Sequence, residues 1–352
     1  MQTDVLIVGQ GISGTMLSWW LQKEGKSFLV IDNGAENSSS RIAAGIINPV
    51  TGRRYAISWL AETLLEFAQS TYKEFSLHLQ AVLFYQRNII DFYPTPQMRN
   101  TFLERITEND SFLHTYPDQN RFNDYFNFDF GCGEIGPAFT VNLSLLLKLW
   151  RQKLCEAELL LQEEFVSAEL VVKDDNIQYR NITAQKIIFC DGIAAASNPW
   201  FERLPFAANK GEALIIECLG LPTDHVFKRG LLLAPTQYPE RFWVGSNYQW
   251  DFVDDKPSET FYNKTKALLD GWMKLPYTIV QHLAGVRPAT VERRPFVGFH
   301  PVHTPVGILN GMGTKGTSLA PFFAHQLVQN IVHGLPIMAE ADVRRFSRIL
   351  SK

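Results

Sequence analysis

The chain has 352 residues, 46% of them apolar, and its 33 lysines and arginines against 36 aspartates and glutamates give a formal net charge of −3. A chain of this length and apolar content folds into about one or two compact domains, which excludes a disordered or collagen-like protein. Nucleic-acid binders usually carry a basic excess, and this chain has none, so we expect no nucleic-acid partner.

The first 32 residues predict a strand, a glycine turn, a helix and a second strand. Residues 4–8 (DVLIV) form a short apolar run, and residues 9–14 (GQGISG) follow at once. Residues 15–23 have the apolar face of a helix, and residues 28–31 (FLVI) form a second apolar run. Two parallel strands joined by a helix begin a doubly wound sheet.

Farther along the chain, helical and strand patterns alternate around an aromatic-rich stretch at residues 84–130. That stretch mixes aromatic residues with Asn, Asp and Pro, and we assign it to a second, inserted domain. The predicted helices cover residues 57–79, 141–154, 258–273 and 318–332, and the predicted strands include a hairpin around 174–176, a further strand of the first sheet at 186–190, several strands within 206–250 and a strand at 307–311.

These patterns predict an α/β fold, in which a Rossmann-like nucleotide-binding domain is interleaved with a mostly antiparallel α+β substrate domain. The expected cofactor-binding domain is discontinuous and covers residues 1–80, 140–205 and 278–352. The expected substrate-binding domain covers residues 81–139 and 206–277.

The glycine turn has the spacing Gly9-x-Gly11-x-x-Gly14. Gly9 permits a tight turn, Gly11 lets the backbone approach a pyrophosphate, and Gly14 lets the helix pack close to the strand. The following helix N-terminus offers free N–H groups and a positive dipole to phosphates. Asp32 lies 18 residues beyond Gly14, where an acid binds a ribose hydroxyl. The motif therefore predicts a dinucleotide without a 2′-phosphate and does not distinguish NAD from FAD.

Residues 38–49 (SSSRIAAGIINP) resemble the hydroxyl-rich, Ala-Ala-Gly loop of the D-amino-acid oxidase family, which includes glycine oxidase and sarcosine oxidase. Three serine hydroxyls suit phosphate oxygens, and the small residues after them suit a flat flavin ring. The resemblance implies FAD rather than NAD, so the first domain is expected to be a Rossmann-like FAD-binding domain. The alternative is a solvated serine-rich loop before a helix.

Two later segments resemble the same family. Residues 285–290 (GVRPAT) resemble its G-x-R-P element, whose arginine holds the substrate carboxylate, and this implies the same role for Arg287. Residues 311–321 (GMGTKGTSLAP) resemble its late glycine-rich turn, whose helix points its positive end at the flavin. Lys315 stands where the sarcosine oxidase branch has a carboxylate-binding lysine; the alternative is an exposed turn lysine.

Weaker matches lie between these segments. Phe165 falls where the backbone of the family contacts adenine, and Tyr248 lies in a segment that resembles a late family strand. Tyr248 is expected to cover the substrate, with core packing as the alternative, and it joins Arg287 and Lys315 as a candidate catalytic residue. The residues expected to bind FAD are Gly9, Gly11, Ile12, Ser13, Gly14, Asp32, Asn33, Ser39, Ser40, Arg41, Ala44, Gly45, Ile46, Phe165, Gly313, Thr314, Lys315, Gly316, Thr317 and Ser318.

The sequence departs from the sarcosine oxidase branch at two places. No cysteine follows Cys218, so the covalent flavin attachment of that branch has no counterpart and noncovalent FAD is expected. Residues 242–244 (FWV) lack the lysine that promotes reaction with oxygen in that branch. The electron acceptor is therefore expected to be oxygen or another acceptor, such as a quinone or a protein.

The resemblance implies an FAD-dependent enzyme that oxidises the C–N bond of an amino acid or N-alkyl amino acid, such as a D-amino acid, glycine or sarcosine, by hydride transfer to flavin. Three alternatives stay open: an FAD-dependent dehydrogenase of a 2-hydroxy acid or other small carboxylate, a flavin domain acting on a modified tRNA base, and a flavoprotein without catalytic activity.

The cellular location is predicted from cysteines and apolar runs. The four cysteines form no C-x-x-C pair, which favours reduced thiols and no metal site. No run of about 20 apolar residues exists, and the N-terminus lacks the basic region of a signal peptide, so we expect no membrane span and a cytoplasmic protein.

Overall fold

The computed structural model describes residues 1–108 and 111–351, so two residues of the aromatic-rich stretch and the last residue of the chain lie outside the described part. The chain divides into two compact units. Unit 1 comprises Met1–Arg41, Leu143–Asn209 and Val286–Lys352, and unit 2 comprises Ile42–Asn142 and Lys210–Gly285.

The boundaries of the units differ from those expected from the sequence. Residues 42–80, which the sequence patterns assign to the cofactor-binding domain, belong to unit 2. The reason is strand pairing: β3 (Ile46–Ile47) pairs with β10 (Phe139–Val141), which pairs in turn with β6 (Phe84–Gln86). The assignment of the two units to cofactor and substrate remains a prediction.

Unit 1 contains a sheet with a parallel centre. β1 (Gln2–Val8) pairs in parallel with β2 (Phe28–Ile31) on one side and with β14 (Ile182–Phe189) on the other. Beyond these, β11 (Leu160–Leu161) pairs in parallel with β2, and β21 (Val306–Asn310) pairs in parallel with β14. Counted along the chain, the order of these five strands is 3-2-1-4-5, the order of a doubly wound nucleotide-binding sheet. The predicted fold class is confirmed.

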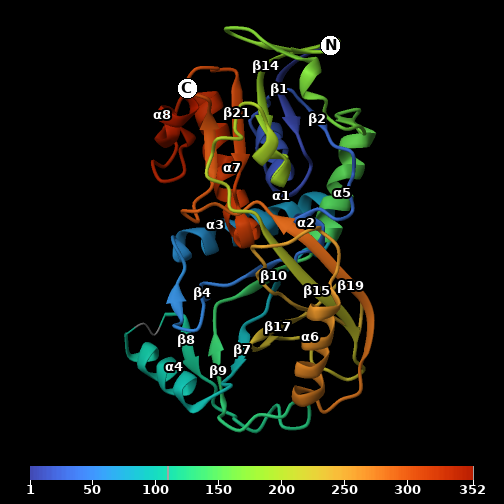
Figure 1. Ribbon diagram of the computed structural model, residues 1–352, viewed down its shortest axis with the longest axis vertical. Coiled ribbons are helices and arrows are strands. Elements are labelled where there is room, and N and C mark those ends of the chain that lie inside the picture. The colour runs from blue at the N-terminus through green and yellow to red at the C-terminus, as the bar shows by residue number, and fades with distance from the viewer. Residues whose placement is uncertain (109–110, 352) are drawn as a thin grey trace. The chain divides into compact units, whose positions relative to one another are not determined.

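Antiparallel strands and helices complete unit 1 (Figure 1). The hairpin predicted around residues 174–176 is present and pairs with β14. The remaining strands are β12 (Leu170–Val172), β13 (Ile177–Tyr179) and β20 (Phe296–Phe299), and the helices are α1 (Ile12–Lys23), α5 (Leu143–Glu156), α7 (Gly316–His333) and α8 (Ser347–Leu350), with α2 (Ser39–Ile42) at the boundary with unit 2.

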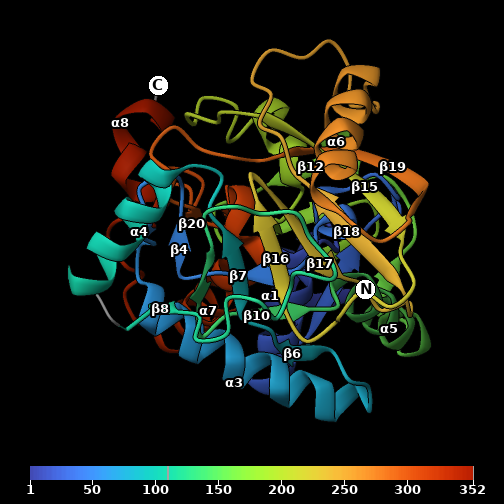
Figure 2. The ribbon, with the colours of Figure 1, turned by 90° about the horizontal axis from the view of Figure 1, so that it is seen from below.

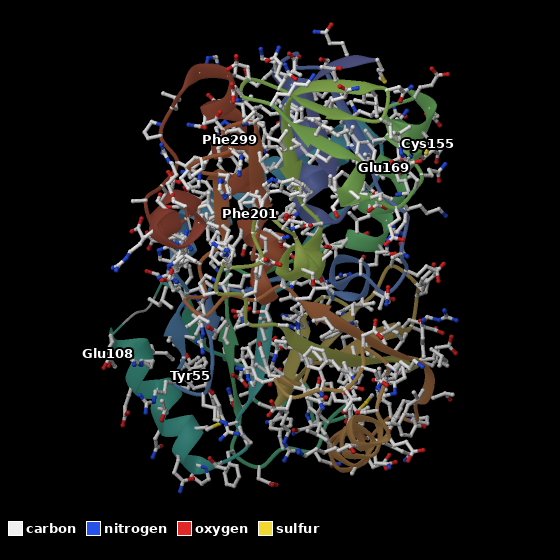
Figure 3. The ribbon with its side chains drawn as sticks, turned by 45° about the horizontal axis from the view of Figure 1, so that its top comes forward. Tyr55, Glu108, Cys155, Glu169, Phe201 and Phe299 are labelled. Atoms are coloured by element: carbon white, nitrogen blue, oxygen red, sulfur yellow. The ribbon has the colours of Figure 1, made fainter. Side chains whose placement is uncertain are left out.

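The helices of unit 1 are fixed by their buried faces. Trp150 of α5 donates from its indole Nε1 to the hydroxyl of Ser18 on α1 at 2.8 Å, and its ring meets Trp19 edge to face. Such a buried indole needs a partner for its N–H, and α1 supplies it. On the sheet, strand residues pack with fully buried aromatics such as Phe201, labelled in Figure 3.

Unit 2 contains an eight-stranded, mostly antiparallel sheet (Figure 2). Only β7 and β16 pair in parallel among the strand pairs whose register is described. The strands in spatial order are β19 (Thr278–Arg287), β15 (Asn209–Glu217), β18 (Arg241–Gly245), β17 (Leu231–Pro235), β16 (Val226–Arg229), β7 (Ile89–Phe92), β9 (Cys132–Ile135) and β8 (Leu113–Thr115).

Smaller elements surround this sheet. A short hairpin joins β4 (Val50–Thr51) to β5 (Ala56–Ile57), and the helices are α3 (Ala61–Leu79), α4 (Pro96–Glu108) and α6 (Glu259–Trp272). Many aromatic side chains of the 84–130 stretch, including Phe92, Phe122 and Phe126, pack in one core with Trp272 of α6. Its aromatic content is therefore explained by core packing.

Helix α4 and strand β19 are among the elements that the sequence did not predict. The helix α4 buries one residue, Phe102, so its apolar face is too narrow to give a helical pattern. The strand β19 is mostly exposed or half-buried along its length, so it shows neither alternation nor an apolar run.

Candidate functional site

The turn between β1 and α1 requires glycine at two positions. Gly9 has a φ of +99°, and a Cβ there would lie 2.5 Å from the carbonyl oxygen of Cys190. A Cβ on Gly14 would lie 1.9 Å from the carbonyl oxygen of Gly9. Real Cβ contacts are never this short, so the predicted tight turn and the close approach of helix to strand are both present in the structure.

The N-terminus of α1 follows this turn directly. Gly11 occupies the N-cap position and supplies no side-chain cap, and the first turn of α1 carries no acidic residue. The backbone N–H of Ile12 donates to the hydroxyl of Ser40 at 3.0 Å. Ser40 thus lies at the helix end, where free N–H groups and the helix dipole favour an anion such as a phosphate.

A second helix N-terminus lies beside the first. The strand β21 is followed by a turn with positive φ at Gly311 and Gly313, and α7 begins at Gly316. A Cβ on Gly316 would lie 3.2 Å from Cγ2 of Ile12 in the first turn of α1. The first turn of α7 has no acidic residue either. Two positive helix ends therefore meet at the carboxyl edge of the parallel strands, where doubly wound folds bind ligands.

The carboxylate of Asp32, at the end of β2, has three partners. Its Oδ2 accepts a hydrogen bond from the backbone N–H of Gln10 at 2.8 Å. Its Oδ1 accepts from the backbone N–H of Gly34 at 2.8 Å and from Nη1 of Arg151 at 2.6 Å. Sequence reasoning missed Arg151, because it lies on α5 and no spacing rule connects it to the glycine turn.

A second acid that the sequence analysis missed lies at the same edge. Asp191 follows β14, and its Cα is 3.2 Å from where a Cβ of Gly9 would stand. Its carboxylate accepts hydrogen bonds from Nδ2 of Asn310 at 3.0 Å and from Nδ2 of Asn198 at 3.4 Å. Burial raises the pKa of Asp191 to about 6, because the charged carboxylate loses water.

Arg287, the predicted carboxylate ligand, lies at the end of β19. Its Nη1 donates to Oδ1 of Asn209 at 2.7 Å. Asn209 is 1% exposed, and its Nδ2 has no hydrogen-bond partner among the described residues. The amide therefore presents its oxygen to the guanidinium and fixes the direction of that cation.

Lys315 lies on a segment that is hydrogen-bonded to the segment of Arg287. The backbone N–H of Gly313 donates to the carbonyl oxygen of Pro288 at 3.2 Å, and a Cβ on Gly311 would press on the methyl of Thr290. Burial lowers the pKa of Lys315 to about 8, so its ammonium is charged at neutral pH and poorly solvated. Unit 1 thus places two cations on adjoining segments.

The remaining predicted residues are distributed over both units. The ring of Phe165 stacks on Tyr179 with centroids 4.9 Å apart, so its side chain belongs to the core of unit 1. The side chain of Asn33 accepts from the backbone N–H of Ala35, which makes a local turn. Unit 1 carries Gly9, Gly11, Ile12, Ser13, Gly14, Asp32, Asn33, Ser39, Ser40, Arg41, Phe165, Arg287, Gly313, Thr314, Lys315, Gly316, Thr317 and Ser318, and unit 2 carries Ala44, Gly45, Ile46 and Tyr248.

The predicted residues of unit 2 lie at two places. Gly45 has a φ of +68°, its carbonyl oxygen accepts from the N–H of Val141 at 2.9 Å, and a Cβ on it would lie 1.9 Å from the carbonyl oxygen of that valine. The Ala-Ala-Gly loop is thus hydrogen-bonded to the end of β10 at a position where only glycine fits. Tyr248 follows β18 and is 62% exposed, so its predicted alternative of core packing is wrong.

The described residues offer neither a metal site nor a helix that could span a membrane. They contain no group of three or more His, Cys, Asp or Glu side chains that could hold a metal ion. In the same part of the chain, no helix is both long and apolar enough to cross a bilayer.

Comparisons with known proteins agree with this geometry. A family model described as FAD dependent oxidoreductase matches residues 4–330. Glycine oxidase from Geobacillus kaustophilus has a similar structure, with a TM-score of 0.79 at 17% identity over 98% of each chain. Iminodiacetate oxidase from Chelativorans sp. BNC1 is also similar in structure, with a TM-score of 0.78 at 19% identity over 98% of each chain. L-proline dehydrogenase from P. horikoshii has a TM-score of 0.77 at 15% identity, and the match covers 99% of this chain and 98% of the dehydrogenase chain.

Proposed function

Since the chain belongs to the FAD-dependent oxidoreductase family, we propose that this enzyme oxidises the C–N bond of an amino acid or N-alkyl amino acid. The observation that carries the proposal is the pair of cations, Arg287 and Lys315, on hydrogen-bonded segments of the unit that contains the nucleotide-binding turn. Glycine, iminodiacetate and L-proline, after which three of the matched structures are named, each carry a carboxylate and an amine.

The residues of unit 1 fit FAD. The glycine turn leaves room for a backbone approach to the pyrophosphate, and the uncapped N-terminus of α1 with Ser40 provides donors for it. The N-terminus of α7 provides a second positive end for the flavin. When bound, FAD supplies the hydride acceptor of the reaction. No cysteine is predicted to attach it, so we propose that it binds noncovalently.

Arg287 is the proposed carboxylate ligand. Its guanidinium is oriented by the bond to Asn209, and the planar fork of a guanidinium matches both oxygens of a carboxylate. A carboxylate fixed in this way directs the Cα–H of the substrate in one orientation, and orientation alone lowers the barrier of a hydride transfer by several kcal/mol, roughly 7 or more in well-aligned cases.

Lys315 is the proposed second cation. Its burial penalises the charged ammonium, and an anion beside it removes that penalty. Carboxylate binding and protonation of Lys315 therefore support each other. A substrate that arrives with a neutral amine needs no further proton transfer to a protein base before its C–H bond is broken.

The partners follow from this chemistry. The substrate is a small molecule, and the electron acceptor is oxygen or another acceptor. A dehydrogenase of a 2-hydroxy acid or other small carboxylate is the second candidate function, because Arg287 and Lys315 recognise the carboxylate and not the amine.

The test is an anaerobic absorbance titration of the purified protein with D-, L- and N-methyl amino acids, with the matching 2-hydroxy acids as controls. The proposal expects one amino acid to bleach the flavin band near about 450 nm. Re-admission of air then distinguishes an oxidase from a dehydrogenase. Bleaching by a 2-hydroxy acid alone would replace the proposal with the second candidate.

A further inference from the structure

A second charged residue lies beside the acid that is expected to bind the ribose of the cofactor. Arg151, on α5, contacts Asp32 at two atoms: Nη1 lies 2.6 Å from the carboxylate Oδ1, and Nη2 donates to the main-chain oxygen at 3.1 Å. The side chains of both residues are mostly buried, with 16% and 17% exposed. The two Nη atoms of Arg151 therefore form a fork that holds both the side chain and the main chain of Asp32 at the end of β2. Ion pairs between exposed side chains rarely keep such a fixed geometry.

Neighbouring residues hold the guanidinium of Arg151 in this position. Gly34, with a φ of +75°, lies against the guanidinium, and a Cβ there would be 3.2 Å from Nη2. Nη1 also lies 3.4 Å from Oε1 of Gln10, whose Nε2 donates to Leu147 O on α5 and to Oγ1 of Thr15 on α1. Gln10 is 1% exposed and is the non-glycine residue between Gly9 and Gly11 in the turn. The glycine turn, α1 and α5 are thus joined by one buried amide.

The carboxylate of Asp32 keeps one acceptor position for a ligand. A carboxylate has about four lone-pair positions, two on each oxygen. The donors of Arg151 and Gly34 reach Oδ1, and the N–H of Gln10 reaches Oδ2. One position on Oδ2 is left for a donor from outside the protein, which matches one hydroxyl of a ribose.

We propose that Arg151 is a positioning residue for the adenosine half of FAD. It acts through Asp32: the guanidinium occupies Oδ1, holds the carboxylate plane and leaves Oδ2 aimed at a single ribose hydroxyl. The proposal rests on the expected role of Asp32 at the ribose, and it is independent of the proposed substrate.

A merely structural link between α5 and β2 makes a different prediction. Loss of such a link loosens the unit and weakens every part of the cofactor site alike. Loss of a positioning residue weakens ligands that carry the adenosine ribose and leaves the flavin half unaffected. Ligands that represent each half of FAD therefore separate the two roles.

The experiment uses the full-length chain after reversible removal of its flavin. Dissociation constants are measured for FAD, ADP and FMN, and also for 2′-deoxy-ADP and 3′-deoxy-ADP. The variants are Arg151→Met, which removes the fork, and Lys148→Met, which removes an equal charge from an exposed position of the same helix.

For Arg151→Met we expect a loss of roughly tenfold in affinity for ADP and FAD, and FMN within twofold of the unaltered protein. We expect one of the two deoxy analogues to bind the unaltered protein more weakly than ADP does. This difference in affinity should shrink in Arg151→Met, because Oδ2 of Asp32 is no longer held in the direction of the ribose hydroxyl. Lys148→Met leaves all constants unchanged.

Three results would overturn the proposal: an ADP affinity within twofold of the unaltered protein, equal losses for FMN and ADP, or a deoxy penalty that the variant leaves intact. If Arg151→Met does not fold, Arg151→Lys replaces it. An ammonium cannot span both the carboxylate and the main-chain oxygen of Asp32, so a smaller loss confined to ADP and FAD is then expected, and no loss would be contrary evidence.

Discussion

Replacement of Asn209 tests how Arg287 is oriented. The bond from Nη1 of Arg287 to Oδ1 of Asn209 is 2.7 Å long and partly buried, and a hydrogen bond to a charged group contributes about 1.5–3 kcal/mol. At about 1.4 kcal/mol per factor of ten, its loss weakens the binding of a carboxylate by roughly 10- to 100-fold. Asn209→Leu is the sharpest variant because leucine resembles asparagine in shape.

The same variant should not lower stability much. The Nδ2 of Asn209 has no partner among the described residues, and a buried donor without a partner costs free energy that leucine does not incur. This gain offsets the loss of the hydrogen bond to Arg287. We expect the free energy of unfolding of Asn209→Leu to stay within about 1 kcal/mol of the unaltered protein.

The assay follows the flavin absorbance of the holoenzyme during titration with acetate, a carboxylate that cannot be oxidised at an amine. The flavin content and the urea unfolding curve are recorded for the same samples. An acetate dissociation constant within twofold of the unaltered protein, in a variant that keeps its flavin, would show that Asn209 does not orient Arg287 for carboxylate binding. Asn209→Ala also removes the amide but leaves a cavity where leucine would pack. A similar loss of acetate affinity in both variants would show that the effect comes from the lost amide oxygen and not from the leucine side chain.

Three further predictions concern pH and the glycine turn. The pKa of Lys315 is about 8, so acetate affinity should fall as the pH rises through about 8 and the ammonium is lost; Lys315→Met should abolish this step in titrations from pH 6 to 9.5. The raised pKa of Asp191 means that the folded state binds its proton more tightly than the unfolded state, so this group stabilises the fold below pH 4 and the contribution is lost as the pH rises through about 6. Asp191→Asn should therefore gain about 1–2 kcal/mol relative to the unaltered protein between pH 4.5 and pH 7 in urea unfolding, and no change in the difference would contradict this. Gly14→Ala forces the backbone apart and should weaken FAD binding at least about tenfold, whereas Gly271→Ala, which has open space around it, should leave FAD binding intact when binding is followed by flavin fluorescence.

The parts of the fold that the sequence predicted are those made by neighbouring residues. The strand, turn, helix and strand within residues 2–31 follow from contiguous apolar runs and glycine spacing, and their pairing was found as expected. The parallel strand at 186–190 was identified for the same reason, since a fully buried strand is a short apolar run.

The parts that the sequence did not predict are made by contacts between distant segments. Arg151 contacts Asp32 across 119 positions, and Arg287 contacts Asn209 across 78. Asp191 meets Asn310 across 119 positions. No local pattern marks such partners, because a single arginine or asparagine on a helix or strand looks like any other until the fold places it.

We propose above that this enzyme holds a carboxylate by Arg287 while it oxidises the neighbouring C–N bond. The direct measurement is the anaerobic rate of flavin bleaching by the best amino acid and by the amine that lacks only its carboxylate, in the unaltered protein and in Arg287→Met. We expect the unaltered protein to prefer the amino acid strongly and Arg287→Met to lose this preference with its flavin still bound. An equal preference in both proteins, or bleaching by no amino acid at all, would contradict it.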